Sequence, residues 1–413
     1  MFSHETSKVI MFANTDWYLY NFRLPLAKAI RDRGLDVVMV SPPGDYGERL
    51  LKEGFRWLPL PMERQSLNPL RELIVISELV RIYRRERPDI VHHFTLKCVI
   101  YGALSARIAK VSRIINAVAG LGFVFTNQGW KAQLIKPLLK LVLRAVLRGN
   151  GSRLIVQNPD DGRLFVLNRL VDANDVRLIR GSGVDTARFT PNSITNPNKH
   201  IRVLMATRLL WDKGVQEYVA AARILKKEGL DIEFLLAGAS DEGNPDAIHA
   251  GQVLAWQAEG VIKALGHVED MHVLLSDMDM VVLPSNYGEG VPRILIEAAA
   301  CGLPIVTTDV PGCRESVVHG INGLLVPPRD AESLAKAIKQ LFIEPQTRRD
   351  MGRASREIAV REFDERLVIG NTLAVYAELL NDGSKAFDEK ASLAVAPGTF
   401  EKNAVQSNVP RIG

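Results

Sequence analysis

The sequence of 413 residues has only three cysteines, Cys98, Cys301 and Cys313, and no long run of apolar residues. The cysteines lie far apart or in unlike contexts, which argues against a disulfide framework or a cysteine metal cluster. No apolar run approaches the roughly 18 residues that a membrane-spanning helix needs, and no basic segment precedes an apolar core at the N-terminus. These absences predict a cytoplasmic protein.

Two nucleotide-binding signatures are also missing. The first predicted strand leads into residues 13–18 (ANTDWY) with no G-x-G-x-x-G, which argues against a dehydrogenase with a dinucleotide cofactor. No G-x-x-x-x-G-K-[ST] occurs either, and this argues against the common P-loop nucleoside triphosphatases.

Acidic residues are missing from one long stretch, since none lies between Asp89 and Asp160. Residues 1–190 contain 29 Lys and Arg against 17 Asp and Glu, a net charge of +12, whereas the remainder has 23 against 30, a net charge of −7. This asymmetry predicts an anionic partner for the N-terminal part. Within the acid-free stretch, residues 131–148 place four cations at four-residue spacing: Lys136, Lys140, Arg144 and Arg148.

Four-residue spacing puts these cations on one face of a helix, with leucines and valines between them. Such a helix is typical of a peripheral contact with an anionic bilayer, in which the leucines enter the interface and the cations meet lipid phosphates. The alternative is a helix packed on the core with a solvated basic face. The acid-free stretch favours the inner face of the plasma membrane as a partner.

Short apolar runs alternate with helix-like segments along the chain. The runs cover residues 8–13, 36–40, 55–60, 89–94, 113–118 and 153–158, and then 202–207, 232–238, 261–266, 280–285, 304–308 and 323–327. Continuous apolar strands separated by helices predict parallel sheets covered on both faces. The fold class is therefore α/β, with two doubly wound domains whose ligands belong at the carboxyl ends of the strands.

The same pattern predicts the domain organisation. An N-terminal domain covers residues 1–188, a polar linker 189–200, and a C-terminal domain 201–360. A C-terminal helix over 361–381 is expected to pack back toward the N-terminal domain. Residues 382–413 are small and polar without periodicity, and we expect them to be disordered.

One segment carries the strongest chemical signal, at residues 286–304 (NYGEGVPRILIEAAACGLP). It follows a buried run, opens with glycines that let backbone N–H groups approach a ligand, and continues as a helix that Gly302 and Pro304 end. The beginning of a helix after a glycine turn is a binding site for anions. Glu289 precedes this helix and Glu297 lies a little over two turns along it, so the two carboxylates reach different parts of one ligand.

This segment resembles the E-x7-E element of the retaining nucleotide-sugar glycosyltransferases of family 4, which have the GT-B fold of two facing Rossmann-like domains with a cleft between them. Residues 207–214 (TRLLWDKG) resemble the turn in which the family holds the donor diphosphate with Arg208 and Lys213. Residues 179–191, 309–315 and 320–326 also match in order. The resemblance implies that Glu289, Arg208 and Lys213 act in catalysis, and it assigns donor binding to Glu297, Gly290, Val291, Arg293 and Gly183.

The N-terminal half matches this family less sharply. Residues 89–94 (DIVHHF) resemble a strand of the family, and residues 119–125 resemble a glycine turn that in many relatives begins with histidine, where this chain has Ala119. We therefore expect His92 to act in catalysis or acceptor binding, with the alternative that it is a satisfied polar group of the core. Gly120 and Gly122 are assigned to the acceptor together with the basic helix.

The resemblance implies transfer of an N-acetylhexosamine or hexose from a UDP-sugar to a polyprenyl-diphosphate-linked acceptor in bacterial O-antigen, capsule or exopolysaccharide synthesis. A UDP-sugar epimerase of the same fold and a non-catalytic scaffold are the alternatives. Asp277-Met278-Asp279 spells a D-x-D, but it directly precedes a buried run, and cations with a helix N-terminus can neutralise the diphosphate instead. We therefore expect no metal cofactor and no nucleic-acid partner.

Overall fold

The computed structural model describes residues 7–64, 66, 68–120, 130–149, 151–192, 200–241, 243–380 and 398–399, with the side chains of 130–135 and 398–399 outside the description. The chain divides into two compact units. The first unit comprises Met1–Ile179 together with Leu367–Gly413, and the second unit comprises Arg180–Arg366.

The first unit is built on an eight-stranded sheet in the order β14-β7-β6-β5-β4-β1-β2-β3. Its strands are β1 (Lys8–Phe12), β2 (Asp36–Ser41), β3 (Arg56–Pro59), β4 (Ile90–Phe94), β5 (Ile114–Val118), β6 (Ser152–Val156), β7 (Val176–Leu178) and β14 (Gly398–Thr399). Neighbouring strands are parallel except β14, which pairs antiparallel with β7.

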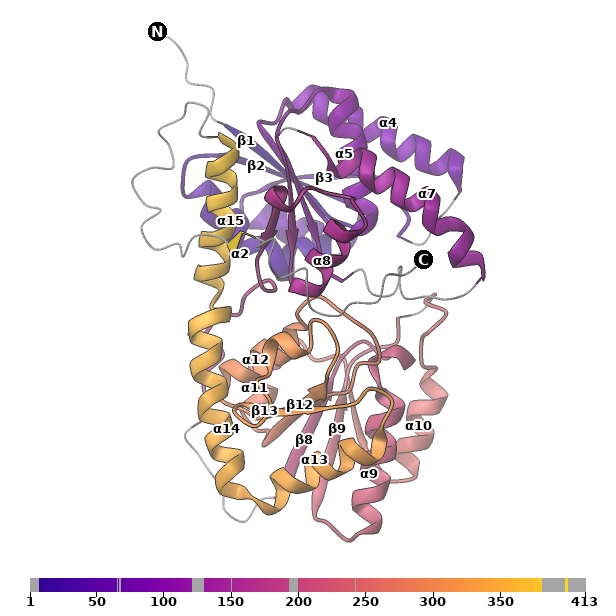
Figure 1. Ribbon diagram of the computed structural model, residues 1–413, viewed down its shortest axis with the longest axis vertical. Helices are drawn as coiled ribbons and strands as arrows, with labels where there is room; N and C mark the ends of the chain where they lie inside the picture. Colours follow the sequence, from indigo (N-terminus) through magenta and orange to yellow (C-terminus); the bar gives the residue numbers. More distant parts are fainter. Residues whose placement is uncertain are drawn as a thin grey trace. The chain divides into compact units, whose positions relative to one another are not determined.

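Helices cover both faces of this sheet (Figure 1). One apolar core lies under α4 (Pro69–Glu86), α5 (Leu96–Ala109), α7 (Trp130–Leu147) and α8 (Pro159–Leu167). The opposite core lies under α2 (Leu24–Arg31), α3 (Gly47–Lys52) and α15 (Glu365–Leu380). Between β1 and α2 the chain forms the short helix α1 (Asp16–Tyr18) and the π-helical turn η1 (Leu19–Arg23), and the 3-10 turn η2 (Ala173–Asp175) precedes β7.

The second unit has a six-stranded parallel sheet in the order β10-β9-β8-β11-β12-β13. Its strands are β8 (Ile201–Ala206), β9 (Ile232–Ala237), β10 (Lys263–Gly266), β11 (Met280–Leu283), β12 (Ile305–Thr308) and β13 (Gly323–Val326). Its helices are α9 (Val215–Lys227), α10 (Ala250–Ala258), α11 (Met271–Leu275), α12 (Arg293–Ala300), α13 (Ala331–Ile343) and α14 (Pro345–Ile358), with the shorter turns η3 (Trp211–Lys213), η4 (Arg314–Ser316) and η5 (Ala359–Phe363).

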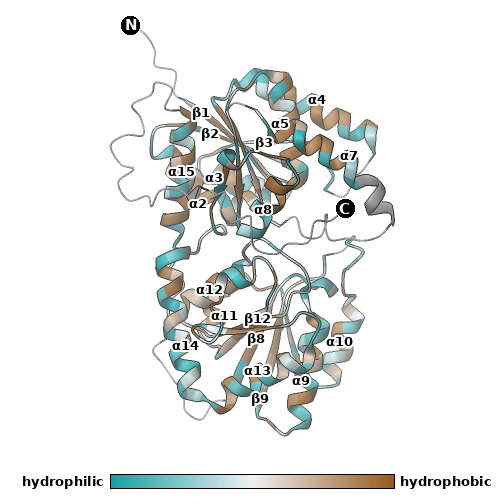
Figure 2. Cartoon of the chain, in the orientation of Figure 1, coloured by the Kyte–Doolittle hydropathy of each residue, from teal (hydrophilic) through white to brown (hydrophobic). Residues whose placement is uncertain are grey.

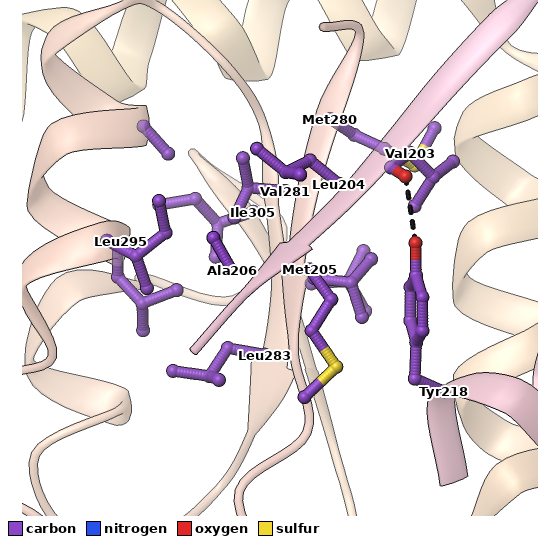
Figure 3. Close-up of a cluster of buried hydrophobic side chains, with 14 of the residues drawn as sticks. Val203, Leu204, Met205, Ala206, Tyr218, Met280, Val281, Leu283, Leu295 and Ile305 are labelled. Atoms are coloured by element: carbon purple, nitrogen blue, oxygen red, sulfur yellow. Dashed lines mark hydrogen bonds between the residues drawn. The ribbon is translucent and has the colours of Figure 1, made fainter. Parts of the chain in front are cut away.

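Burial explains why these segments are strands. The central strands of both sheets are hydrophobic along their length, as Figure 2 shows, because helices cover both of their faces. In the second unit the buried side chains of β8, β11 and β12 form one hydrophobic cluster with Leu295 of α12 and Tyr218 of α9 (Figure 3). The hydroxyl of Tyr218 on α9 is buried there and donates to the carbonyl of Val203 at 2.8 Å, which satisfies its polar atom inside the core.

All twelve apolar runs of the sequence are strands, so the predicted α/β fold class is confirmed. The sequence missed β7, because three residues with a central arginine give no apolar run. The buried Arg177 of this strand bonds to Glu378 of α15, with its Nε 3.0 Å from a carboxylate oxygen. A charge inside a strand is thus stabilised by a residue some 200 positions later in the chain.

The division between the units falls earlier than the predicted boundary at residue 188, because residues 180–188 pair with the end of the second unit. The N–H of Val184 donates to the carbonyl of Phe363 at 2.8 Å, and the N–H of Glu365 donates back to Val184 at 3.0 Å. From Leu367 onward α15 packs on the first sheet through residues such as Tyr376. The predicted linker and tail lie mostly outside the described residues.

Candidate functional site in the second unit

The second sheet has one topological switch point, between β8 and β11. From β8 the chain continues to β9 on one side, and from β11 it continues to β12 on the other side. The loops that leave the two carboxyl ends therefore diverge, and in doubly wound sheets ligands bind at this place. The loop after β8 carries Arg208 and Lys213, and the loop after β11 carries Glu289.

Lys213 and Glu289 meet at this point. The Lys213 ammonium bonds to the Glu289 carboxylate, and only 8% and 13% of the two side chains are exposed. The ammonium also lies 5.1 Å from the centre of the Tyr287 ring. Burial by itself lowers the pKa of Lys213, but the charge of Glu289 and the nearby Tyr287 outweigh it, so the pKa of this ammonium lies above its usual value. Lys213 is therefore a fixed positive charge.

Two glycines bring the loops this close. Gly214 has a φ of +77°, and a Cβ on it would lie 1.9 Å from the carbonyl oxygen of Pro284, directly after β11. Gly312 has a φ of +85°, and a Cβ there would lie 1.7 Å from the carbonyl oxygen of Gly290. The N–H of Glu289 donates to the carbonyl of Pro311 at 2.9 Å. The backbone around Glu289 is thus fixed by the loop that follows β12.

Helix α12 starts just after this turn. Its N-cap is Pro292, which makes no side-chain cap, so the first N–H groups of the helix are not capped by a side chain. Together with the Lys213 ammonium, these groups give the turn the positive character that the sequence predicted for an anion.

Glu297 and Arg293, both assigned to the donor, contact each other one turn apart on α12. The Arg293 Nε lies 2.6 Å from a Glu297 carboxylate oxygen. Burial raises the pKa of Glu297, and the charge of Arg293 opposes this increase. The Glu297 carboxylate is thus buried and already oriented by Arg293 in this structure.

Arg208 lies on the same loop as Lys213, but about half of its side chain is exposed, and it pairs with Asp241 at 2.6 Å. Its charge is close enough to oppose protonation of Lys213. The two predicted cations are therefore neighbours, and each pairs with a different carboxylate, Lys213 with Glu289 and Arg208 with Asp241. Asp241 and Tyr287 are partners that the sequence did not predict, although Tyr287 stands two positions before Glu289.

Two further predicted donor residues serve in packing. Gly183 has a φ of +79°, and a Cβ on it would lie 2.5 Å from the Cα of Glu365, so glycine is required for the close approach of two backbone segments. Val291 is buried, and a Cβ at Gly181 would lie 3.3 Å from its Cβ. Gly290 lies in the turn itself, against Gly312.

The D-x-D carboxylates contact Arg202 at the opposite end of β8. Asp277 pairs with the Arg202 guanidinium, and Asp279 accepts the backbone N–H of Arg202 at 2.8 Å. Within the described residues no cluster of three metal-ligating side chains occurs.

In the first unit, His92 lies in the core beneath α15. It is 1% exposed, and its Nδ1 lies 2.8 Å from the Tyr376 hydroxyl of α15. Burial, followed by the charge of Arg23, holds the pKa of His92 well below its usual value. The position of His92 therefore does not support its expected catalytic role, because α15 covers it.

The basic helix forms as α7, and four of its residues were assigned to acceptor or membrane binding. Arg144 is exposed and Lys136, Lys140 and Arg148 are half-buried, while Leu138 and Leu141 beside them are 63% and 65% exposed. Leu143, Val146 and Leu147 face the core. Gly120 has a φ of +79°, and Gly122 lies outside the described residues. No described helix is long and apolar enough to cross a bilayer.

The two doubly wound sheets place the chain in the Rossmann-like class of α/β folds. Residues 187–358 match the model of glycosyl transferases group 1, and residues 8–156 match that of the glycosyl transferase 4-like family. The chain belongs to this family and is a glycosyltransferase of the GT-B fold.

Curated relatives and solved structures agree with this assignment. The chain is 28% identical to the N,N'-diacetylbacillosaminyl-diphospho-undecaprenol alpha-1,3-N-acetylgalactosaminyltransferase of Campylobacter jejuni, over 88% of this chain and 96% of the relative. It is 33% identical to the D-inositol 3-phosphate glycosyltransferase of Pseudarthrobacter chlorophenolicus, over 68% of this chain and 69% of the relative. The structure of Anabaena HepE in complex with UDP is similar with a TM-score of 0.71 at 19% identity, over 90% of this chain and 100% of HepE.

Proposed function

We propose that this glycosyltransferase moves an N-acetylhexosamine or hexose from a UDP-sugar to a polyprenyl-diphosphate-linked acceptor in bacterial surface glycan synthesis. The Lys213 and Glu289 pair at the switch point of the second sheet is the observation that carries the donor half of this proposal. The name of the Campylobacter relative supports the lipid-linked acceptor, and the UDP complex of HepE supports the nucleotide.

The chemistry follows from where negative charge develops. As the bond from the sugar to the diphosphate breaks, charge accumulates on the leaving oxygens. Lys213, Arg208 and the N–H groups at the beginning of α12 are fixed in advance, so they stabilise this charge more in the transition state than in the ground state. Glu289 orients the sugar hydroxyls, and Glu297 binds the ribose hydroxyls. Retention at the anomeric carbon follows from the family resemblance.

We further propose that the reaction needs no metal ion, because the cations of the second unit can neutralise the diphosphate and because Arg202 engages both D-x-D carboxylates. Transfer from a panel of UDP- and GDP-sugars to membrane-extracted polyprenyl-linked acceptors is expected to proceed unchanged with excess EDTA. Sensitivity to EDTA that Mg²⁺ or Mn²⁺ reverses would refute metal independence. Sugar conversion without any acceptor would instead indicate an epimerase.

Peripheral binding to an anionic bilayer through α7 is the third part of the proposal. The exposed Leu138 and Leu141 stand beside the Lys140 and Arg144 cations, and each basic residue near an anionic surface contributes about 1 kcal/mol. The double variant Lys140→Glu with Arg144→Glu is expected to lose most of its binding to vesicles that contain anionic lipid. Co-sedimentation at two salt concentrations measures this loss.

The matched control for this measurement is Lys226→Glu with Lys227→Glu on α9 of the second unit, which reverses the same number of positive charges. Equal loss of vesicle binding in both double variants would show that net charge, rather than α7, governs attachment.

A further inference from the structure

Arg23 at the end of η1 is a buried cation with no carboxylate partner among the described residues. The residue is 7% exposed, and its guanidinium lies 4.4 Å from the centre of the Phe94 ring and 5.3 Å from that of Tyr18. One Nη donates to the Tyr18 hydroxyl at 2.7 Å. The Nε is buried and has no hydrogen-bond acceptor within the described ranges.

The side chains that contact Arg23, Tyr18 and Phe94, are neutral. Strand β4 presents Phe94 and the imidazole of His92, whose ring centres lie 4.0 Å apart. Helix α15 contributes Tyr376, whose hydroxyl forms a hydrogen bond with His92 Nδ1. His92 Nε2 is a second buried nitrogen that has no hydrogen-bond partner among the described residues. The Arg23 charge acts to lower the pKa of both His92 and Tyr376, so the three side chains lie close together.

Asp16 is the only acid between Ala13 and Arg31, and its carboxylate is used elsewhere. It accepts the backbone N–H groups of Trp17, Tyr46 and Gly47, each at 2.8 Å. The loop after β1 therefore supplies no counter-ion to Arg23.

A buried charge without a counter-charge is costly, and proteins generally pair such groups. A bound anion would remove this cost. Guanidinium groups suit phosphate oxygens in particular, because their planar fork of N–H donors can bind two oxygens at once.

The position of Arg23 in the fold also points to a ligand. In the first sheet β1 is followed by β2 and β3 on one side, and β4 is followed by β5 on the other, so the switch point lies between β1 and β4. Arg23 comes from the segment after β1 and stacks on Phe94, the last residue of β4. Lys213 has the corresponding place in the second sheet, after β8 and beside the loop that follows β11. Lys213 has Glu289 as its partner, whereas Arg23 pairs with no carboxylate in the part of the chain that the structure describes.

We propose that Arg23 is the anion-binding residue of the first unit and that it binds the diphosphate of the lipid-linked acceptor. This inference rests on the proposed function for the identity of the ligand, and on the burial and position of Arg23 for the existence of the site. A diphosphate bound there would hold the acceptor at the carboxyl end of the first sheet, while the donor diphosphate occupies the second.

The kinetic test compares Arg23→Met and Arg23→Lys with the wild type. For Arg23→Met we expect a rise of about tenfold or more in KM for the polyprenyl-diphosphate-linked acceptor, with KM for the UDP-sugar unchanged, and a smaller rise for Arg23→Lys. The melting temperature of Arg23→Met should stay equal or increase, because an apolar chain replaces an uncompensated charge. Arg31→Met is the matched control, since Arg31 ends the next helix and also stacks on a phenylalanine, Phe55, at 4.6 Å.

A binding measurement makes the result independent of turnover. Farnesyl diphosphate is titrated by calorimetry in the presence of saturating UDP, which occupies the donor site, and we expect at least about tenfold weaker binding to Arg23→Met than to the wild type. Unchanged affinity and unchanged acceptor KM would overturn the proposal. A rise in donor KM alone would assign the anion to the donor, and a lower melting temperature with unchanged probe binding would reduce Arg23 to a packing residue. A wild type that binds the probe but transfers no sugar would contradict the proposed function and leave the Arg23 site intact.

Discussion

Replacing Lys213 with alanine is expected to lower kcat for sugar transfer by roughly 10²–10³-fold, the range seen when one preorganised donor to a developing negative charge is removed. The variant loses the buried ammonium at the switch point of the second sheet, and it also removes that partner from the Glu289 carboxylate, of which only 13% is exposed. Steady-state kinetics with a UDP-sugar and the lipid-linked acceptor give kcat and both KM values. Lys227→Ala, an exposed lysine on the neighbouring helix α9, is the matched control and should resemble the wild type.

The double variant Lys213→Met with Glu289→Leu separates catalysis from folding. Removing both members of a buried ion pair is commonly neutral for stability, whereas removing one is destabilising. We therefore expect the double variant to melt closer to the wild type than Lys213→Ala does, and to remain inactive. Activity that returned together with stability would mean that Lys213 and Glu289 only hold the loops together, and it would contradict the roles proposed for both residues.

Gly214→Ala is expected to destabilise the protein by roughly 3–5 kcal/mol. A Cβ at this position would lie 1.9 Å from the Pro284 carbonyl oxygen, and the φ of +77° is unfavourable for alanine. The loop after β8 would have to move away from β11, which separates Lys213 from Glu289. Chemical denaturation monitored by circular dichroism measures the loss, and a fall in the fraction of soluble protein would accompany it.

Gly229→Ala provides the control, because Gly229 has the same φ of +77° but no atom within 4 Å of its Cβ position. Only the backbone preference is then lost, about 1 kcal/mol. Equal effects at the two glycines would show that backbone strain, and not the contact with the end of β11, makes Gly214 necessary.

The fold was largely predictable because its signal is local and repeated. Buried parallel strands must be apolar along their length, so twelve runs such as residues 280–285 marked twelve strands. The short strand β7 gave no such signal, because Arg177 inside it depends on Glu378 from the distant helix α15. The boundary near residue 180 was missed for the same reason, since Val184 pairs with residues beyond 360.

The site residues likewise divide into those that contiguous sequence predicts and those whose contacts only the tertiary structure shows. Glu289 and Lys213 were predicted as site residues because glycine turns and helix starts are recognisable from contiguous residues. The structure brings the two side chains together as an ion pair. The sequence did not predict that Arg208 pairs with Asp241 or that Arg293 pairs with Glu297, because an exposed or helical charge has several possible partners. His92 was given a catalytic role because a histidine at a strand end looks the same whether it faces solvent or the helix that covers it.

The sequence by itself determined the α/β class, the two parallel sheets, the glycine turns and the membership of the glycosyltransferase family, because each of these depends on residues close together in the chain. Only the tertiary structure decided which charges are buried and which are compensated. It paired Lys213 with Glu289, covered His92 with α15, and stacked Arg23 on Phe94 with no carboxylate partner among the residues it describes. The physical reason is that the burial of a side chain and the pairing of its charge depend on neighbours from all parts of the chain. A pattern of contiguous residues therefore cannot predict them.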